Sequence, residues 1–233
     1  MNIINEKVEN YIHGLYKPLS NELKAFREEG EKNHVPIILR DTEELILNML
    51  RIKKPKKILE IGTAIGYSAC CFATACEEAR ILTIEQDSDM KVLAEANIRN
   101  LGFENRIQII EGDGLQVMND MKGWNKEELF DFVFIDAGKS HYQEFFDEAR
   151  NMCNPNALII SDNVLLKTKT ASDPIHTVRR HRTHVRKMRE FLSHVTNLSG
   201  VHTSVIPVGD GLAISVIEGN ENNEKHKIGG INE

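Results

Sequence analysis

Short apolar runs alternate with segments of helical periodicity through most of the chain. Five apolar runs are predicted to be strands, at residues 57–61, 81–85, 107–111, 130–135 and 157–161. Between them, apolar residues recur at the spacing of amphipathic helices, at residues 68–77, 88–100, 114–121 and 142–152. Alternation of this kind predicts parallel strands joined by crossover helices.

Helices precede this alternating region. Apolar spacing predicts one helix before Pro18, a second that Ser20 can cap, and a third that Asp41 or Thr42 can cap. Residues 33–38 contain a proline and are predicted to form a loop, because the residue before a proline avoids the helical region.

A helix and a hairpin are predicted to close the fold. The helix covers roughly residues 174–198, and strands follow at 201–208 and 212–218. Asp210-Gly211 between the two apolar runs is a strong hairpin signal, so the last strand is expected to run antiparallel. We therefore expect an α/β fold with a mostly parallel, seven-stranded sheet, an antiparallel last strand, and helices on both faces.

Length and composition fit one domain. The chain has 233 residues, of which 41% are hydrophobic and 27% charged, and a single α/β domain often reaches this length. We assign residues 1–218 to one domain, with the N-terminal helices (1–55) included, and expect 219–233 to be a flexible tail. The chain lacks a membrane-spanning apolar run, a secretory signal and metal-type cysteine spacing, so a cytoplasmic protein with no membrane partner is expected.

The net charge of −6 conceals a basic segment at residues 167–189. This segment holds eight Lys or Arg against one acid, so it carries +7 while the remainder carries −13. A concentrated basic segment in an acidic protein is a candidate for docking a polyanion, although a solvated helix face has the same pattern. The candidate contacts are Arg179, Arg180, Arg182, Arg186, Lys187 and Arg189.

A glycine turn is predicted after the first strand. Residues 62–66, Gly-Thr-Ala-Ile-Gly, let the backbone turn tightly and approach a ligand, and the helix near Ser68 adds free N–H groups. Ala64 and Tyr67 depart from the dinucleotide fingerprint G-x-G-x-x-G, which argues against an NAD-dependent oxidoreductase. Taken alone, the turn is also compatible with a plain strand-to-helix connection.

Acidic residues mark the ends of the first three predicted strands. Glu60 precedes the glycine turn, Glu85 ends the second strand, and Asp113-Gly114 follows the third. Open α/β sheets bind ligands at this rim, where an acidic side chain can accept hydrogen bonds from ribose hydroxyls. A nucleotide-like cofactor is therefore predicted.

Oxygen ligands follow the fourth and fifth predicted strands. Asp136 ends the fourth strand and Asp162-Asn163 ends the fifth, so a sequentially wound sheet places them side by side. Two carboxylates and an amide oxygen suit Mg²⁺ or Ca²⁺ rather than zinc. Lys139 could point into the same cleft as a general base. Asp and Asn also cap turns, and most lysines are solvated, so a purely structural role stays open.

These motifs together resemble the cation-dependent O-methyltransferases of the class I S-adenosylmethionine fold, a family that includes catechol and caffeoyl-CoA O-methyltransferases. The resemblance covers about residues 33–218, through motifs at 59–68, 83–87, 111–114, 130–142, 160–165 and 208–214. It implies a Rossmann-like class I methyltransferase fold, S-adenosylmethionine as cofactor, and Mg²⁺ or another divalent cation.

A closer resemblance is to the bacterial tRNA 5-hydroxyuridine methyltransferases, which form 5-methoxyuridine at the wobble position. It is carried by the Arg-rich helix and by the motifs at 34–37, 56–68, 161–165 and 206–215. The resemblance implies a tRNA anticodon loop as partner and a homodimer. A small-molecule O-methyltransferase for catechols or CoA esters stays the alternative, because both substrate classes offer adjacent oxygens. Intact metal ligands disfavour a non-catalytic RNA-binding module.

The resemblance also implies a role for individual residues. Cofactor contacts are expected from Ile38, Glu60, Gly62, Gly66, Ser68, Glu85, Asp113, Gly114 and Asp136. The metal ligands would be Asp136, Asp162 and Asn163, and the catalytic residues Lys139 and Asp136. Residues 138–141, Gly-Lys-Ser-His, depart from the expected Ala-Lys-x-x-Tyr form, although Lys139 and Tyr142 remain.

Overall fold

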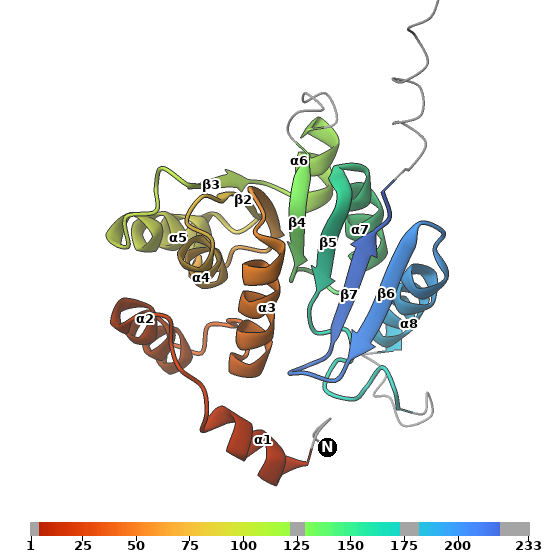
Figure 1. Ribbon diagram of the computed structural model, residues 1–233, viewed down its shortest axis with the longest axis horizontal. Coiled ribbons are helices and arrows are strands. Elements are labelled where there is room, and N and C mark those ends of the chain that lie inside the picture. The colour runs from red at the N-terminus through yellow and green to blue at the C-terminus, as the bar shows by residue number, and fades with distance from the viewer. Residues whose placement is uncertain (1–4, 122–128, 173–181, 220–233) are drawn as a thin grey trace, which may run out of the picture.

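Seven strands form one sheet in the order β3-β2-β1-β4-β5-β7-β6 (Figure 1). The computed structural model describes residues 5–121, 129–172 and 182–219. The strands are β1 (Lys57–Ile61), β2 (Arg80–Glu85), β3 (Ile107–Glu111), β4 (Phe130–Ile135), β5 (Cys153–Ser161), β6 (Val201–Ile206) and β7 (Leu212–Ile217).

The direction of the strands confirms the expected Rossmann-like sheet. Strands β1 to β5 pair in parallel, whereas β7 pairs antiparallel with both β5 and β6. The turn between β6 and β7 contains Gly209 and Gly211 at positive φ, 56° and 91°. Glycine adopts these angles without steric cost, which lets the hairpin close.

Helices cover both faces of the sheet. In the described ranges they are α1 (Glu6–His13), α2 (Asn21–Lys32), α3 (Arg40–Lys53), α4 (Tyr67–Ala75), α5 (Ser88–Asn100), α6 (Gly114–Met121), α7 (Tyr142–Asn151) and α8 (Arg182–Asn197). Helices α6, α7 and α8 pack in one apolar core, and α3, α4 and α5 in the other. None of these helices has the length and apolar character needed to cross a bilayer.

Strand β4 divides the two cores. Val133 and Ile135 pack toward α6, α7 and α8, whereas Phe132 and Phe134 pack toward α3 and α4. All four side chains are at most 1% exposed. Because successive strand residues point to opposite faces, a strand covered by helices on both sides is apolar throughout.

Most predicted boundaries agree with the structure to within two residues, and β5 and α8 differ more. Strand β5 begins at Cys153 rather than at residue 157, because Cys153 pairs with Phe130 ahead of a shift in register. Helix α8 is observed from Arg182, and the start of its predicted range lies outside the described residues. The same holds for residues 220–233 of the expected tail.

The cap predicted for α3 is wrong. The helix begins at Arg40, directly after Leu39, and neither Asp41 nor Thr42 caps it. Asp41 instead accepts a hydrogen bond at Oδ2 from the N–H of Gly209, at 3.0 Å. This contact joins α3 to the turn between β6 and β7. The cap predicted for α2 is confirmed, since Ser20 Oγ accepts from the α2 backbone.

The chain reverses its winding direction between β1 and β4. From β1 the sheet continues to β2 and β3 on one side, and from β4 it continues to β5 on the other. The chain therefore continues from β1 to α4 and from β4 to α7 on opposite faces of the sheet, and a crevice forms at the carboxyl ends of these strands. Open α/β sheets bind ligands at such a point.

Candidate cofactor cavity and metal site

The turn after β1 brings its backbone against the loop after β4. Gly62 has a φ of +102° and Gly66 a φ of +82°. A side chain at Gly62 would collide with the backbone carbonyl of Asp136. The Gly62 N–H donates to the carbonyl of Ile84 at 3.0 Å. Only glycine combines this φ with such a close approach, so the tight turn predicted from the sequence is present.

The Glu85 carboxylate closes this turn from the end of β2. Its Oε2 accepts hydrogen bonds from the N–H groups of Thr63 (3.1 Å) and Ala64 (2.8 Å). Its Oε1 accepts from the N–H of Asp87 at 2.9 Å. Each carboxylate oxygen carries two lone pairs, so Glu85 can hold the turn and still accept a hydrogen bond from a ligand.

Glu60 lies beneath the turn rather than on a ligand-facing wall. Its side chain is fully buried, and its two oxygens accept hydrogen bonds from Ser68 Oγ (2.5 Å) and Thr83 Oγ1 (2.6 Å). Burial raises the pKa of Glu60 to about 7, and the two hydroxyls partly offset that rise. The geometry thus differs from the expected ribose contact, and Glu60 supports the turn from inside. Gly66 packs against α5 and is not among the residues that line the cavity.

A cavity of about 590 Å³ opens at this edge of the sheet. Its volume lies within the range of small-molecule sites. Seven of the nine residues predicted to contact the cofactor line it, namely Ile38, Gly62, Ser68, Glu85, Asp113, Gly114 and Asp136. The structure thus brings residues from five separate segments of the chain together around one space.

The sequence did not reveal all of the cavity wall. Pro36, Ile37, His141 and Phe145 also line it. The ring of Phe145 lies where a side chain at Gly114 would stand, and the apolar pattern of the helix is compatible with a place either in the core or in the cavity wall. Helical periodicity alone cannot separate these two positions for Phe145, since the wall of a cavity is as apolar as the core behind it.

A larger hollow lies at the opposite end of the strands. It has a volume of about 860 Å³ and is lined by Arg80, Arg106 and neighbouring residues of β1, β2 and β3. It contains none of the predicted site residues. We assign the site to the smaller cavity, because that cavity lies at the carboxyl ends of the parallel strands.

The predicted metal ligands lie side by side at the ends of β4 and β5. Asn163 Nδ2 donates to Asp136 Oδ1 at 3.1 Å, and the N–H of Asn163 donates to Asp162 Oδ1 at 2.6 Å. The N–H of Asp162 donates to the carbonyl of Ile135, which fixes β5 against β4. Rotating the side-chain amide of Asn163 so that its oxygen and nitrogen exchange places would direct the oxygen toward Asp136. All three residues can therefore offer oxygens to a cation.

The electrostatics of this cluster fit a cation. Asp162 is 3% exposed, and burial together with the nearby Asp136 carboxylate raises its pKa to about 8. Lys139 lies beside the pair with one positive charge. A buried carboxylate beside a second, partly exposed one gains most from a divalent ion, which would favour the ionised form of both. The donor set suits Mg²⁺ or Ca²⁺.

Lys139 occupies the edge between the cavity and the carboxylates. Its Nζ donates to Asp136 Oδ1 at 3.1 Å and to the hydroxyl oxygen of Tyr142 at 3.0 Å. The Tyr142 hydroxyl donates in turn to the backbone carbonyl of Asp162 at 2.8 Å. Tyr142 is buried and thereby links the lysine to the end of β5. This role of Tyr142 was not evident from the sequence.

Arg189 differs from the expected outward-facing phosphate contact. Its Nε donates to the carbonyl of Thr170 at 2.8 Å, and its Nη2 donates to the carbonyl of Ser172. Thr170 Oγ1 donates to the carbonyl of Val164, directly after the predicted metal ligands. Arg189 therefore secures the loop that follows β5.

The other described cations of α8 lie nearer the surface. Arg186 pairs with Glu190 at 2.8 Å, Lys187 pairs with Glu144 at 3.6 Å, and Arg182 is exposed. Pairs of this kind on an exposed face are weak, so both cations can exchange partners. Two further candidates lie outside the described residues, Arg179 and Arg180.

Comparison with known proteins shows which proteins this chain is similar to. A family model described as O-methyltransferase matches residues 15–217. A catechol O-methyltransferase of Niastella koreensis is 30% identical over 175 residues, which cover 74% of this chain and 79% of that protein.

Two solved structures share the fold. A Staphylococcus aureus protein proposed to be a caffeoyl-CoA O-methyltransferase has a TM-score of 0.83 and 32% identity, covering 91% of this chain and all of that one. The O-methyltransferase TomG of Streptomyces achromogenes, solved with S-adenosylmethionine, has a TM-score of 0.77 and 25% identity, covering 91% of this chain and 96% of that one. The chain belongs to the S-adenosylmethionine-dependent O-methyltransferase family.

Proposed function

We propose that this protein transfers a methyl group from S-adenosylmethionine to the 5-hydroxyl of 5-hydroxyuridine at the tRNA wobble position (34), giving 5-methoxyuridine, in a divalent-cation-dependent reaction. One observation carries the proposal. Asp136 lines the cofactor cavity and also contacts Asn163 beside the buried carboxylate of Asp162. A methyl donor and a chelated acceptor would therefore meet at a single side chain.

The seven cavity-lining residues predicted from the sequence would hold the cofactor, which supplies an activated methyl group on its sulfonium sulfur. Glu85 would accept hydrogen bonds from the ribose hydroxyls. Asp113 Oδ1 accepts from the N–H groups of Leu115 and Gln116, both at 3.0 Å, so its side chain is fixed at the start of α6. Asp113 and Gly114 would border the adenine ring.

Asp136, Asp162 and Asn163 would hold the cation, whose chemistry is to lower the pKa of the acceptor hydroxyl and to orient two adjacent oxygens. 5-Hydroxyuridine offers its 5-hydroxyl and the neighbouring 4-carbonyl. Lys139 lies 3.1 Å from Asp136. Beside a bound divalent cation, Lys139 would release its own proton to solvent, and its neutral amine would then receive the proton of the acceptor hydroxyl. Tyr142 holds the lysine in this position, and such positioning contributes much of the rate enhancement in methyl transfer.

The basic character of α8 favours tRNA as the acceptor. Helix α8 follows the predicted metal ligands in the chain, and Arg189 ties it to the loop at residues 164–172. Arg182 and Arg186 stand on its exposed side. Phosphate contacts of this kind supply affinity and position, and the bases of an anticodon loop can turn outward into a pocket.

A second candidate function is methylation of a small catechol-like or CoA-linked acceptor. It is favoured by the 30% identity to a catechol O-methyltransferase. The metal ligands cannot distinguish the two substrate classes, because a catechol also presents two adjacent oxygens. The choice therefore depends on whether α8 contacts the acceptor.

The proposal is tested by incubating the purified protein with S-adenosylmethionine, Mg²⁺ and tRNA carrying 5-hydroxyuridine. The nucleosides are then read by mass spectrometry, with a catechol in a parallel tube. A 5-methoxyuridine peak that disappears with a chelator supports the proposal. Unchanged tRNA together with a methylated catechol would favour the second candidate.

We also propose that two copies of the chain associate through α1. Val8, Tyr11 and Leu15 of this region are 47%, 71% and 57% exposed, and α1 has no buried residue. Figure 1 shows α1 at the periphery of the fold. Light scattering should give the mass of a dimer, and Tyr11→Ser with Leu15→Ser should shift the mass toward the monomer.

A further inference from the structure

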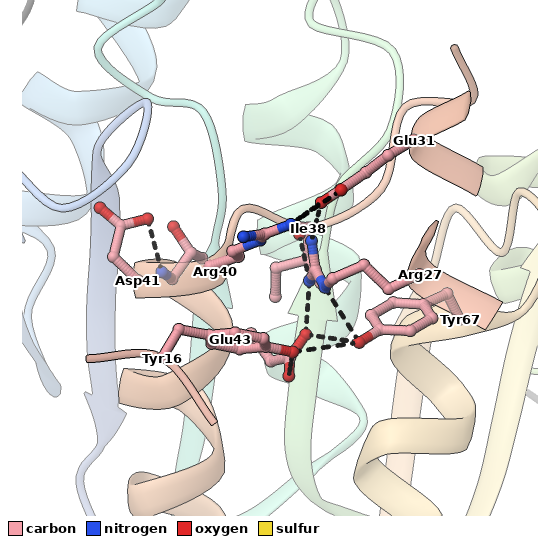
Figure 2. A network of polar contacts seen from close by, with 9 residues as sticks. Tyr16, Arg27, Glu31, Ile38, Arg40, Asp41, Glu43 and Tyr67 are labelled. Carbon is pink, nitrogen blue, oxygen red and sulfur yellow. Dashed lines mark hydrogen bonds and ion pairs between the residues drawn. The ribbon is translucent and has the colours of Figure 1, made fainter. Parts of the chain in front are cut away.

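Arg27 of α2 is a buried cation outside the cavity and outside the predicted metal ligands. Its side chain is 4% exposed, and Figure 2 shows it between Tyr67 and the backbone of Ile38. A buried charge persists in a fold only when it is paired and hydrogen-bonded. The partners of Arg27 therefore indicate what the residue is there to hold.

The Arg27 guanidinium joins three elements of the fold. Nη2 donates to Glu43 Oε2 of α3 at 2.5 Å and to the carbonyl of Ile38 at 2.8 Å. Nε donates to the Tyr67 hydroxyl of α4 at 3.1 Å. Nη1 donates to Glu31 Oε1 at 3.1 Å. All three guanidinium nitrogens thus have partners.

Glu43 completes the network from the opposite side. It is 1% exposed, and its Oε2 accepts from Tyr67 at 2.9 Å as well as from Arg27. Its Oε1 accepts from the Tyr16 hydroxyl at 2.8 Å. The ion pair is therefore desolvated and fully hydrogen-bonded. Removing one partner of such a pair leaves the other charge buried and unpaired, so the geometry is strongly fixed.

Two members of this network also touch the cofactor cavity. Ile38 and Tyr67 line its wall, and Pro36 and Ile37 extend that wall along the same loop. Gly30 of α2 faces both the glycine turn and the loop, because a β-carbon there would lie 3.2 Å from Ile65 Cδ1 and 3.5 Å from Ile37 Cδ1. The carbonyl that Arg27 holds thus belongs to the loop that covers the cavity.

We propose that Arg27, Glu43 and Tyr67 are positioning residues that hold loop 36–38 over the cofactor and so determine the affinity for S-adenosylmethionine. The inference rests on the cofactor placement proposed above. A loop held in its bound position loses little entropy when the ligand enters, whereas a released loop must be ordered at that step. The N-terminal helices therefore contribute to cofactor binding through a contact made beside the cavity.

The test compares the binding of S-adenosylhomocysteine by calorimetry, which needs no methyl acceptor. Removing Arg27 alone would leave Glu43 as an unpaired buried charge, so the main variant is Arg27→Met with Glu43→Gln. Tyr67→Phe removes a single hydroxyl and is the milder variant. Arg40→Gln is the matched control, because Arg40 pairs with Glu31 at 2.8 Å on the exposed side of the same network.

The double variant should raise the Kd for S-adenosylhomocysteine about tenfold, which corresponds to about 1.4 kcal/mol. Tyr67→Phe should have a smaller effect in the same direction, and Arg40→Gln should leave the Kd unchanged. Amide hydrogen exchange of the peptide 34–40 should accelerate in the double variant while the strands stay protected. A merely structural role would not give this local response.

Three other results would overturn the inference. If the wild-type protein and the double variant bind S-adenosylhomocysteine with equal affinity, Arg27 and Glu43 do not position the loop for the cofactor. The proposed function would then stay intact. If the double variant fails to fold, wild-type affinity of Tyr67→Phe for S-adenosylhomocysteine would likewise overturn the inference. Absence of binding by the wild-type protein would instead refute the cofactor placement itself.

Discussion

The backbone of Gly62 lies directly against the backbone carbonyl of Asp136, with no room for a side chain between them. One residue belongs to the turn that lines the cofactor cavity, and the other begins the predicted metal site. The two halves of the site are therefore joined through a backbone contact between β1 and β4. A change at this contact is expected to disturb both halves.

Gly62→Ala should abolish binding of S-adenosylhomocysteine and lower the melting temperature. The new β-carbon adds a collision with Asp136 to the strain of a positive φ. Gly102→Ala is the matched control, since Gly102 has a φ of +74° but no atom within 4 Å of the added carbon. The control should lose only about 1–2 kcal/mol of folding free energy, the cost of a left-handed conformation for a residue with a β-carbon. Equal losses in the two variants would show that the close approach does not matter.

Glu60 should make the protein less stable as the pH rises from about 4.5 to about 7. Its pKa is raised from 4.5 when unfolded to about 7 when folded, so the folded state holds more protons in this window. Stability therefore falls with rising pH, by on the order of 3 kcal/mol across the window. Denaturant titrations should show a flatter pH dependence for Glu60→Gln. If stability falls equally steeply with pH in the wild-type protein and in Glu60→Gln, Glu60 is not the group whose raised pKa causes the fall.

Lys139→Met should reduce kcat by 10²–10⁴-fold if the lysine receives the hydroxyl proton. The Kd for S-adenosylhomocysteine should change little, because the carboxylates and the glycine turn remain. Tyr142→Phe should reduce kcat less, since it removes only the hydroxyl that holds Nζ. Steady-state kinetics with calorimetry checks both variants. A large change in Kd with unaltered kcat would assign Lys139 to the cofactor instead.

Arg182→Glu with Arg186→Glu should weaken tRNA binding and reduce its salt dependence, because phosphate contacts release counterions. Methylation of a small catechol should be spared. Arg189→Gln should reduce activity on both acceptors, since Arg189 holds the loop after β5 through Thr170 and Ser172. Filter binding at several salt concentrations measures the affinity for tRNA and separates variants that lose phosphate contacts from the variant that loosens the loop after β5. Equal loss on both acceptors for the Arg182 and Arg186 variant would indicate misfolding.

Local patterns predicted the parts of the fold that depend on neighbours in sequence. The apolar runs marked the strands, and the polar residues that end them marked the carboxyl edge of the sheet. Because β4 and β5 are adjacent and parallel, Asp136 and Asp162-Asn163 had to lie close together. The position of Gly62 and Glu85 in the cavity wall followed from the same rule.

The direction of individual side chains could not be predicted in the same way. Glu60 lies in a strand that is buried on both faces, so the apolar pattern does not show which way its carboxylate points. Asp41 bonds to Gly209, 168 residues away, and Arg27 bonds to Tyr67 across α2 and α4. Contacts between distant segments depend on how the helices pack, and the sequence carries no local signal for them.

The proposed cation site is predicted to be needed for methyl transfer but not for cofactor binding, although both share Asp136. The most direct measurement determines the S-adenosylhomocysteine Kd and the methyl-transfer rate of Asp162→Ala in parallel with the wild-type protein. We predict a Kd within about threefold of wild type, a difference below 1 kcal/mol, and no methyl transfer even with excess Mg²⁺. A wild-type rate in the variant after treatment with a chelator would contradict the account.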